Sequence, residues 1–282
     1  MSSLCLCVSV ADFHPLEALL AGRASVRAAA EHDAIDGVVP RVVVEPHGPE
    51  ALAESLGWCS REGRTVVLRG GATKLSWGRR PESVDVILST GRLNRLVAHR
   101  HGDLTATMEA GIRVVDLNRE LARHGQWLPV DAAFGEATIG GTIATNDSGP
   151  LRHRHGSARD LLLGVQLATT DGRLVKAGGH VVKNVAGYDL GKLMSGSFGS
   201  LAAIVTATFK LAPLPPATAT LLSAFDGSSS LNAALHAIAP VLKTVTFFIA
   251  AVEGLANFWK MLKSSLQSRT DSGKSFLALC AA

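Results

Sequence analysis

Three glycine-rich loops, each placed where an apolar run ends, constrain the fold of this chain more than any other feature. They are LRGGATKLSWG at 68–78, DAAFGEATIGGTIATNDSGP at 131–150 and GSFGSLAAI at 196–204. One glycine pair alone is ordinary turn chemistry. Glycine also lets backbone N–H groups converge on an anion with no Cβ in the way. Three such loops in one core predict a site that holds a pyrophosphate without a metal or a lysine cluster.

The two commonest nucleotide-binding motifs are absent from the sequence. In GYDLGKL, residues 187–193, only three residues separate the glycines, and Leu193 stands where a P-loop needs a hydroxyl for magnesium. No G-x-G-x-x-G opens a helix, as a Rossmann fold requires. A different nucleotide-binding fold is therefore expected.

Hydrophobic periodicity predicts a mixture of helices and hairpins. Before Pro40 the periodicity is weakly helical, and after it apolar strands and amphipathic helices follow one another. This pattern differs from the strict strand-helix alternation of a doubly wound sheet and predicts an α+β fold. We expect strands at 41–46, 65–70, 84–88 and 201–216, hairpins at 95–111 and 161–179, and helices at 48–63, 114–125 and 187–196.

Composition narrows the class of protein. The 282 residues are 47% hydrophobic, and the net charge of +4 comes from dispersed arginines, which favours anionic small molecules over nucleic acid. Four cysteines, Cys5, Cys7, Cys59 and Cys280, form neither a disulfide framework nor a zinc site. No basic region precedes the N-terminal apolar stretch, and the apolar segment 244–259 carries Glu253. A reduced, cytoplasmic protein without a membrane span is expected.

The segments LRGGATKLSWG, ATIGGTIATNDSGPLRHRHGSARDLLLGVQLATTDGRLVKAGG and KNVAGYDLGKLMSGSFGSLAAIVTATFKLAPLP resemble FAD-binding domains of the vanillyl-alcohol oxidase (PCMH) type. Within that family they are most similar to the FAD-binding subunits of bacterial glycolate oxidases. The resemblance implies a PCMH-type FAD-binding domain at 40–216 with two α+β subdomains, about 40–95 and 96–216. An N-terminal segment, 1–39, would precede it, and a short, incomplete cap region, 217–282, would follow.

The resemblance also implies the residues that hold FAD. The first loop would surround the pyrophosphate, with Gly70 and Gly71 giving close backbone approach and Thr73 a hydroxyl, and Ile204 would lie against the adenine or flavin. Because Ala72 and Thr73 stand where covalent members often carry a histidine, noncovalent FAD is expected. The full set is Arg69, Gly70, Gly71, Ala72, Thr73, Lys74, Thr138, Ile139, Gly140, Gly141, Ala144, Thr145, Asn146, Gly149 and Ile204. Trp77 is either loop packing or a cofactor contact.

The substrate site is the least determined part of the sequence. Oxidation of a 2-hydroxy acid needs a cationic clamp for the carboxylate and a base for the hydroxyl proton. RHRHGSARD, residues 152–160, offers cations, and His153 and His155 would share one side of a strand but lack a third metal ligand. Lys183, Asn184 and Tyr188 are further candidates. After Pro216 the sequence has one histidine, His236, and one arginine, Arg269. We assign no catalytic residue and no metal site.

Three hypotheses follow from the sequence. The first is an FAD-binding oxidoreductase subunit of a glycolate oxidase complex, with catalytic and iron–sulfur partner subunits, a small 2-hydroxy acid substrate and peripheral association with the inner membrane through the complex. The second is a self-sufficient FAD-dependent 2-hydroxy-acid dehydrogenase of the D-lactate type. The third is a non-catalytic FAD-binding assembly subunit.

Overall fold

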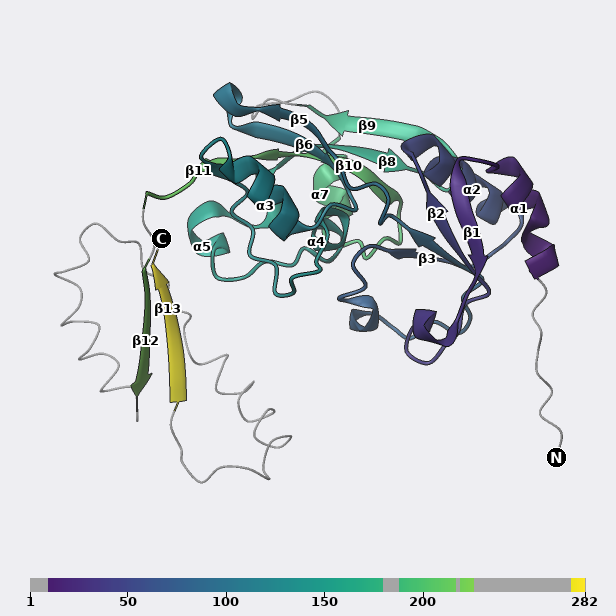
Figure 1. Ribbon diagram of the computed structural model, residues 1–282, viewed down its shortest axis with the longest axis horizontal. Helices are drawn as coiled ribbons and strands as arrows, with labels where there is room; N and C mark the ends of the chain where they lie inside the picture. Colours follow the sequence, from purple (N-terminus) through teal and green to yellow (C-terminus); the bar gives the residue numbers. More distant parts are fainter. Residues whose placement is uncertain (1–9, 180–187, 217–218, 226–274, 282) are drawn as a thin grey trace. The chain divides into compact units, whose positions relative to one another are not determined.

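The computed structural model describes residues 10–179, 188–216, 219–225 and 275–281 (Figure 1). The chain divides into two units, Met1–Leu214 and Pro215–Ala282. The first unit contains two large sheets and one two-stranded sheet with their helices, and it confirms the α+β fold class. In the second unit, β12 (Ala219–Phe225) and β13 (Ser275–Ala281) form an antiparallel pair. The expected cap region, including 244–259, lies mostly outside the described residues.

The first sheet is four-stranded and mainly parallel. Its central strands are rich in β-branched residues and fully buried, as in Val42–Val44, because helices and loops cover both faces. The predicted helix at 48–63 is confirmed as α2 (Pro49–Arg61), with a proline in its first turn and a buried stripe through Leu52, Leu56 and Cys59. The strand order is β1 (Ala24–Ala28), β2 (Val42–Pro46), β4 (Val86–Ser89), β3 (Val66–Arg69), with only β1 antiparallel.

The segment before Pro40 differs from its weakly helical prediction. It forms η1 (Val10–Phe13), the one-and-a-half-turn helix α1 (His14–Leu19), strand β1 and η2 (Glu31–Asp33). Phe13, Leu16 and Leu20 are buried in the core shared by the first sheet and α2. This segment therefore completes the first sheet and its core.

The second sheet is five-stranded and antiparallel. Both predicted hairpins are confirmed, one turning through η4 (His101–Asp103) and one through Gly172, whose φ of 84° suits glycine. In the strand at 203–210, a bulge between Ile204 and Thr206 interrupts the pairing with the strand at 162–168. The strand order is β5 (Leu96–Arg100), β6 (Thr105–Glu109), β10 (Ala203–Lys210), β8 (Leu162–Ala168), β9 (Leu174–Gly178).

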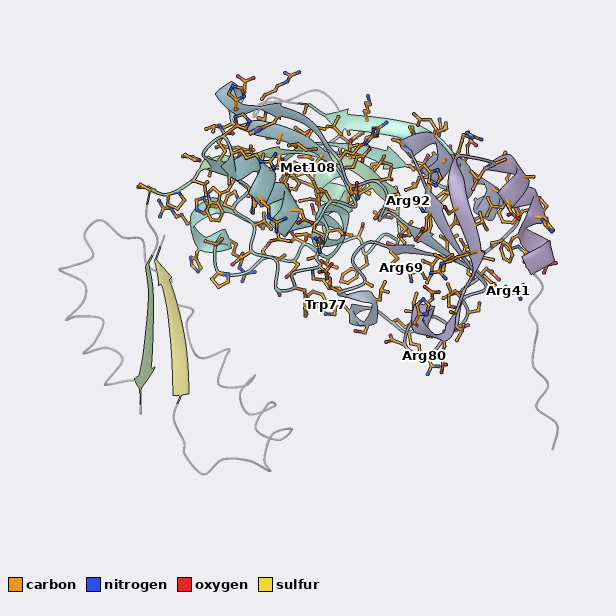
Figure 2. The ribbon with its side chains drawn as sticks, viewed as in Figure 1. Arg41, Arg69, Trp77, Arg80, Arg92 and Met108 are labelled. Carbon is orange, nitrogen blue, oxygen red and sulfur yellow. The ribbon has the colours of Figure 1, made fainter. Side chains whose placement is uncertain are left out.

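Short helices cover one face of this second sheet (Figure 1). Figure 2 shows Met108, which is fully buried, between the sheet and these helices. The segment between the helices at 114–122 and 139–145 contributes β7 (Gln126–Trp127), which pairs with β11 (Ala212–Pro213). The helices are α3 (Val114–Ala122), α4 (Ile139–Thr145), α5 (Arg152–His155), α6 (Ala158–Leu161) and α7 (Leu190–Met194).

Candidate functional site: a cleft between the two sheets

A cleft lies where the carboxyl ends of parallel strands β3 and β4 face helix α4. In open α/β sheets, ligands bind outside the carboxyl ends of parallel strands. Two cavities with shared lining residues, of about 360 and 70 Å³, form this cleft, and the larger is within the range of small-ligand sites. Most of the predicted cofactor residues line them: Arg69, Gly70, Gly71, Ala72, Thr73, Lys74, Thr138, Gly140, Gly141, Ala144, Thr145 and Ile204.

The remaining predicted residues lie beside the cleft. Ile139 is buried in the core that packs against the second sheet, and Asn146 ends α4 with a left-handed φ of 49°. Gly149 lies directly against the carboxylate of Asp131, which accepts hydrogen bonds from the N–H groups of Gly149 and Leu151 at 2.9 and 3.1 Å. Asp131 therefore fixes the loop that follows α4, a role that nothing in the sequence indicated.

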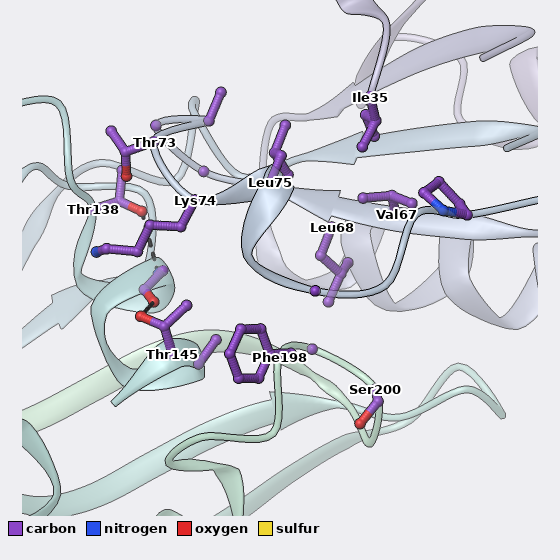
Figure 3. Close-up of a pocket in the computed structure, with 18 of the residues that line it drawn as sticks. Ile35, Val67, Leu68, Thr73, Lys74, Leu75, Thr138, Thr145, Phe198 and Ser200 are labelled. Carbon is purple, nitrogen blue, oxygen red and sulfur yellow. Dashed lines mark hydrogen bonds between the residues drawn. The ribbon is translucent and has the colours of Figure 1, made fainter. Parts of the chain in front are cut away.

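The two ends of the cleft differ in polarity (Figure 3). Thr73, Lys74 and Thr138 lie at one end of the view, whereas Ile35 and Val67 lie at the other. The apolar end was not predicted from the sequence, because Ile35, Val67 and Leu68 have the character of ordinary core or strand residues. A ligand that fits the whole cleft needs a polar part and an apolar part.

The loop after β3 carries backbone donors that have no partner. Within the described residues, no hydrogen bond involves the backbone N–H groups of residues 70–74. Backbone donors are normally paired with protein, water or ligand. Five consecutive free donors in a loop that lines the larger cavity suit an oxygen-rich anion such as a pyrophosphate.

The structure gives a more specific reason for the two glycines of this loop. A Cβ on Gly70 would collide with the side chain of Thr138, and a Cβ on Gly71 with the backbone carbonyl of Glu136. Gly71 does not have a positive φ; the left-handed residue of the loop is Ala72, at 58°. The bare backbone therefore lets the loop from the first sheet pack directly against residues 136–138.

Arg69 is held by a buried carboxylate from the segment before Pro40. Its Nη1 donates to Oδ1 of Asp33 at 2.7 Å, and Arg27 donates to the same carboxylate through two nitrogens at 2.7 and 2.9 Å. The hydrogen bonds from Arg27 hold the pKa of Asp33 far below its usual range, against the effect of burial. Arg69 thus anchors the start of the loop through its side chain (Figure 2).

A second ion pair crosses the cleft. Nζ of Lys74 lies 2.7 Å from Oδ2 of Asp147, and the two side chains are only 5% and 13% exposed. Lys74 also lies above the ring of Trp77, 5.5 Å from its centroid. This pair joins the loop after β3 to the segment after α4. The half-exposed Trp77 does not line either cavity.

The cationic segment at 152–159 lies apart from this cleft. It forms helices α5 and α6, so His153 and His155 stand on a helical turn and the predicted strand is wrong. His155 packs edge-on against Trp127 at 5.8 Å, and burial lowers the pKa of its imidazole. No residue of this segment lines either cavity. Tyr188 is 91% exposed, and Lys183 and Asn184 lie outside the described residues.

In the described part of the chain, no group of three or more His, Cys, Asp and Glu residues is placed to hold a metal ion. None of its helices is long and apolar enough to cross a membrane.

Comparison with known proteins matches residues 40–178 to the family described as FAD binding domain. Residues 40–178 belong to this family. The matched region contains β2 to β9 and all of the cleft-lining residues of the loop after β3 and of α4. The cofactor of this domain is FAD, and the free amides and the apolar end of the cleft fit its pyrophosphate and its ring systems.

Several curated proteins are similar over most of this chain. Glycolate oxidase subunit GlcD of Bacillus subtilis is 30% identical over 72% of this chain and 43% of its own length. D-lactate dehydrogenase of Archaeoglobus fulgidus is 35% identical over 61% and 39%, and glycolate oxidase subunit GlcE of Escherichia coli is 35% identical over 61% and 49%. The chain thus spans less than half the length of these relatives.

A solved structure shows the same fold. Alkyldihydroxyacetonephosphate synthase superposes with a TM-score of 0.64 and 19% identity, covering 86% of this chain and 47% of that chain. At this identity the likeness concerns the fold alone.

Proposed function

We propose that this chain is the FAD-binding subunit of a complex that oxidises a small 2-hydroxy acid, with glycolate as the substrate and glyoxylate as the product. The cleft carries the proposal, because five unpaired backbone donors line it inside an FAD binding domain. The similarity to two proteins named as glycolate oxidase subunits supports the substrate class.

On this proposal each part of the cleft has a task. The amides of residues 70–74 hold the pyrophosphate, and Thr73 and Thr138 supply hydroxyls. Lys74, paired with Asp147, fixes the position of the loop. Ala72 and Thr73 offer no histidine for a covalent flavin link, so FAD is held noncovalently. When bound, FAD supplies the two-electron acceptor, and the protein orients it.

The substrate is recognised outside this cleft. Oxidation of a 2-hydroxy acid removes two electrons and two protons, so the carboxylate needs a cation and the hydroxyl needs a base. The similarity to two proteins named as subunits supports a substrate site built with another polypeptide. The partners are catalytic and iron–sulfur subunits that accept the electrons. The chain lies in the cytoplasm and is associated with the surface of the inner membrane through the complex.

A second candidate is a self-sufficient dehydrogenase of the D-lactate type. The similarity to a protein named D-lactate dehydrogenase favours it. The two candidates differ in whether the isolated chain transfers electrons from the hydroxy acid to its own FAD.

Anaerobic flavin reduction tests both candidates. The purified chain should bind FAD and absorb at about 450 nm, the band of oxidised flavin. Glycolate should bleach this band only after the partner subunits are added. Bleaching of the isolated chain by D-lactate or glycolate would favour the second candidate. FAD that stays oxidised in the assembled, active complex would show a non-catalytic assembly subunit, and a chain that binds no FAD would refute both enzyme functions.

A further inference from the structure

Phe198 lies in the cleft with a backbone conformation that phenylalanine rarely adopts. Its φ is 53°, in the left-handed region that bulky residues rarely adopt, and it lies between two residues of the same turn with positive φ, Gly196 and Gly199. Such strain persists only where the surrounding structure holds it and is typical of ligand sites. The position therefore calls for a reason beyond the turn, because asparagine or glycine would fit the backbone better.

The turn around Phe198 is fixed to the end of helix α4. The N–H of Phe198 donates to the carbonyl of Ala144 at 2.8 Å, and the N–H of Gly196 donates to the carbonyl of Ile143 at 3.1 Å. On its other side the turn meets β3, because a Cβ on Gly199 would lie 3.1 Å from the side chain of Leu68. The turn that carries Phe198 is thus bonded to α4 and packed against β3.

The ring itself is left in the cleft. Phe198 lines both cavities and is 53% exposed, although an aromatic ring gains most when it is buried. Figure 3 shows the ring between Leu68 on the first sheet and Thr145 on α4. It lies between the polar end, with Lys74, and the apolar end, with Val67. A dinucleotide whose pyrophosphate is held at the polar end would bring one of its planar rings to this position.

We infer that Phe198 is a stacking platform for one of the two planar heterocycles of FAD, adenine or isoalloxazine. The inference rests on the proposed FAD-binding function and adds a positioning residue to it. The strained backbone is retained because it presents the ring to the ligand, and the bound heterocycle covers the apolar surface that is exposed in the free protein. Stacking of a base on an aromatic side chain predicts an effect on affinity of about tenfold to a hundredfold.

The test compares three variants of Phe198 with a matched control. Phe198→Asn removes the ring but tolerates the left-handed backbone, whereas Phe198→Tyr and Phe198→Trp keep an aromatic ring. Leu201→Asn is the control, since Leu201 is 50% exposed three residues further on and lines neither cavity. The dissociation constant for FAD is measured by fluorescence titration of the full chain, and the melting temperature of the apoprotein is measured beside it.

Phe198→Asn should weaken FAD binding at least about tenfold while its apoprotein melts no lower than the wild type. Tyrosine or tryptophan at position 198 should keep the affinity, and Leu201→Asn should leave it unchanged. Weakened binding of ADP identifies adenine as the stacked ring, and weakened binding of riboflavin identifies isoalloxazine. The inference is overturned if Phe198→Asn binds FAD like the wild type, or if the asparagine and tyrosine variants lose it equally. A wild-type chain without FAD affinity would instead refute the proposed function.

Discussion

The substitution Gly71→Ala tests whether the loop after β3 must pack against residues 136–138. A Cβ on Gly71 would lie 2.8 Å from the carbonyl carbon of Glu136 and closer still to its oxygen. Carbon atoms in contact are about 3.5–4.0 Å apart. The loop would therefore have to move away from residues 136–138 by about 1 Å or more, because the obstacle is backbone and cannot rotate aside.

The cost of this displacement should appear mainly in the bound state. The free protein can relax by opening the contact, whereas the FAD-bound protein must hold the loop against both the ligand and residues 136–138. Overpacking of this kind costs about 1–3 kcal/mol, which raises the dissociation constant for FAD by about 5-fold to 150-fold. The apoprotein should keep its circular dichroism spectrum and lose a few degrees of melting temperature.

Gly135→Ala is the matched control for this prediction. Gly135 directly precedes Glu136, lines neither cavity and has no positive φ, and an added Cβ would meet nothing within 4 Å. Its variant should bind FAD like the wild type. The assay is fluorescence titration of FAD into both variants, with thermal melts of the apoproteins. Equal affinity of Gly71→Ala and the wild type would refute the reasoning, as would an equal loss in both variants.

Three further predictions concern buried groups. Because its folded-state pKa is depressed, the Asp33 carboxylate should stabilise the fold above about pH 4 and lose this contribution as the pH falls. Asp33→Asn should lower the free energy of unfolding by about 2 kcal/mol at pH 7 and flatten the acid side of the plot of melting temperature against pH. Parallel plots for the variant and the wild type would contradict this. Lys74→Met should destabilise the protein by about 3 kcal/mol, because it leaves the carboxylate of Asp147 without its cation. In urea unfolding, adding Asp147→Asn should restore part of this stability, and strictly additive effects of the two substitutions would show that the two side chains are not coupled. Burial raises the pKa of the Cys59 thiol to about 12, so at pH 8 a maleimide should modify this residue only as the protein unfolds, and fast labelling of its peptide by mass spectrometry would show an open core.

Regular elements followed from the sequence where local pattern and burial agree. Helix α2 combines a first-turn proline with an apolar stripe, and the turn at Gly172 has its own glycine signal. Strand β1 was not predicted, because ASVRA has a single β-branched residue and lies at a sheet edge. Its strand conformation is supported by pairing with β2. Tertiary pairing overrides weak local propensity in such a segment.

The site was predictable only where composition marks it. Glycines and threonines flagged the loop after β3 and the start of α4, and these segments do line the cleft. The contact between Asp33 and Arg69 joins residues 36 positions apart, and no local pattern reports such a pair. Phe198 was missed for a different reason, because a phenylalanine in the left-handed region contradicts the propensity from which a turn is inferred.

The cleft is a joint product of the two sheets, and this bears on how it would hold a cofactor. The close approach of Gly71 to Glu136 and the ion pair between Lys74 and Asp147 both cross it. The loop that offers free amides is therefore positioned by Glu136 and Asp147 as well as by its own strand. These protein contacts order the loop before a ligand binds to its amides. The entropic cost of binding is therefore lower. On the proposed function, affinity for FAD thus depends on contacts that never touch the cofactor.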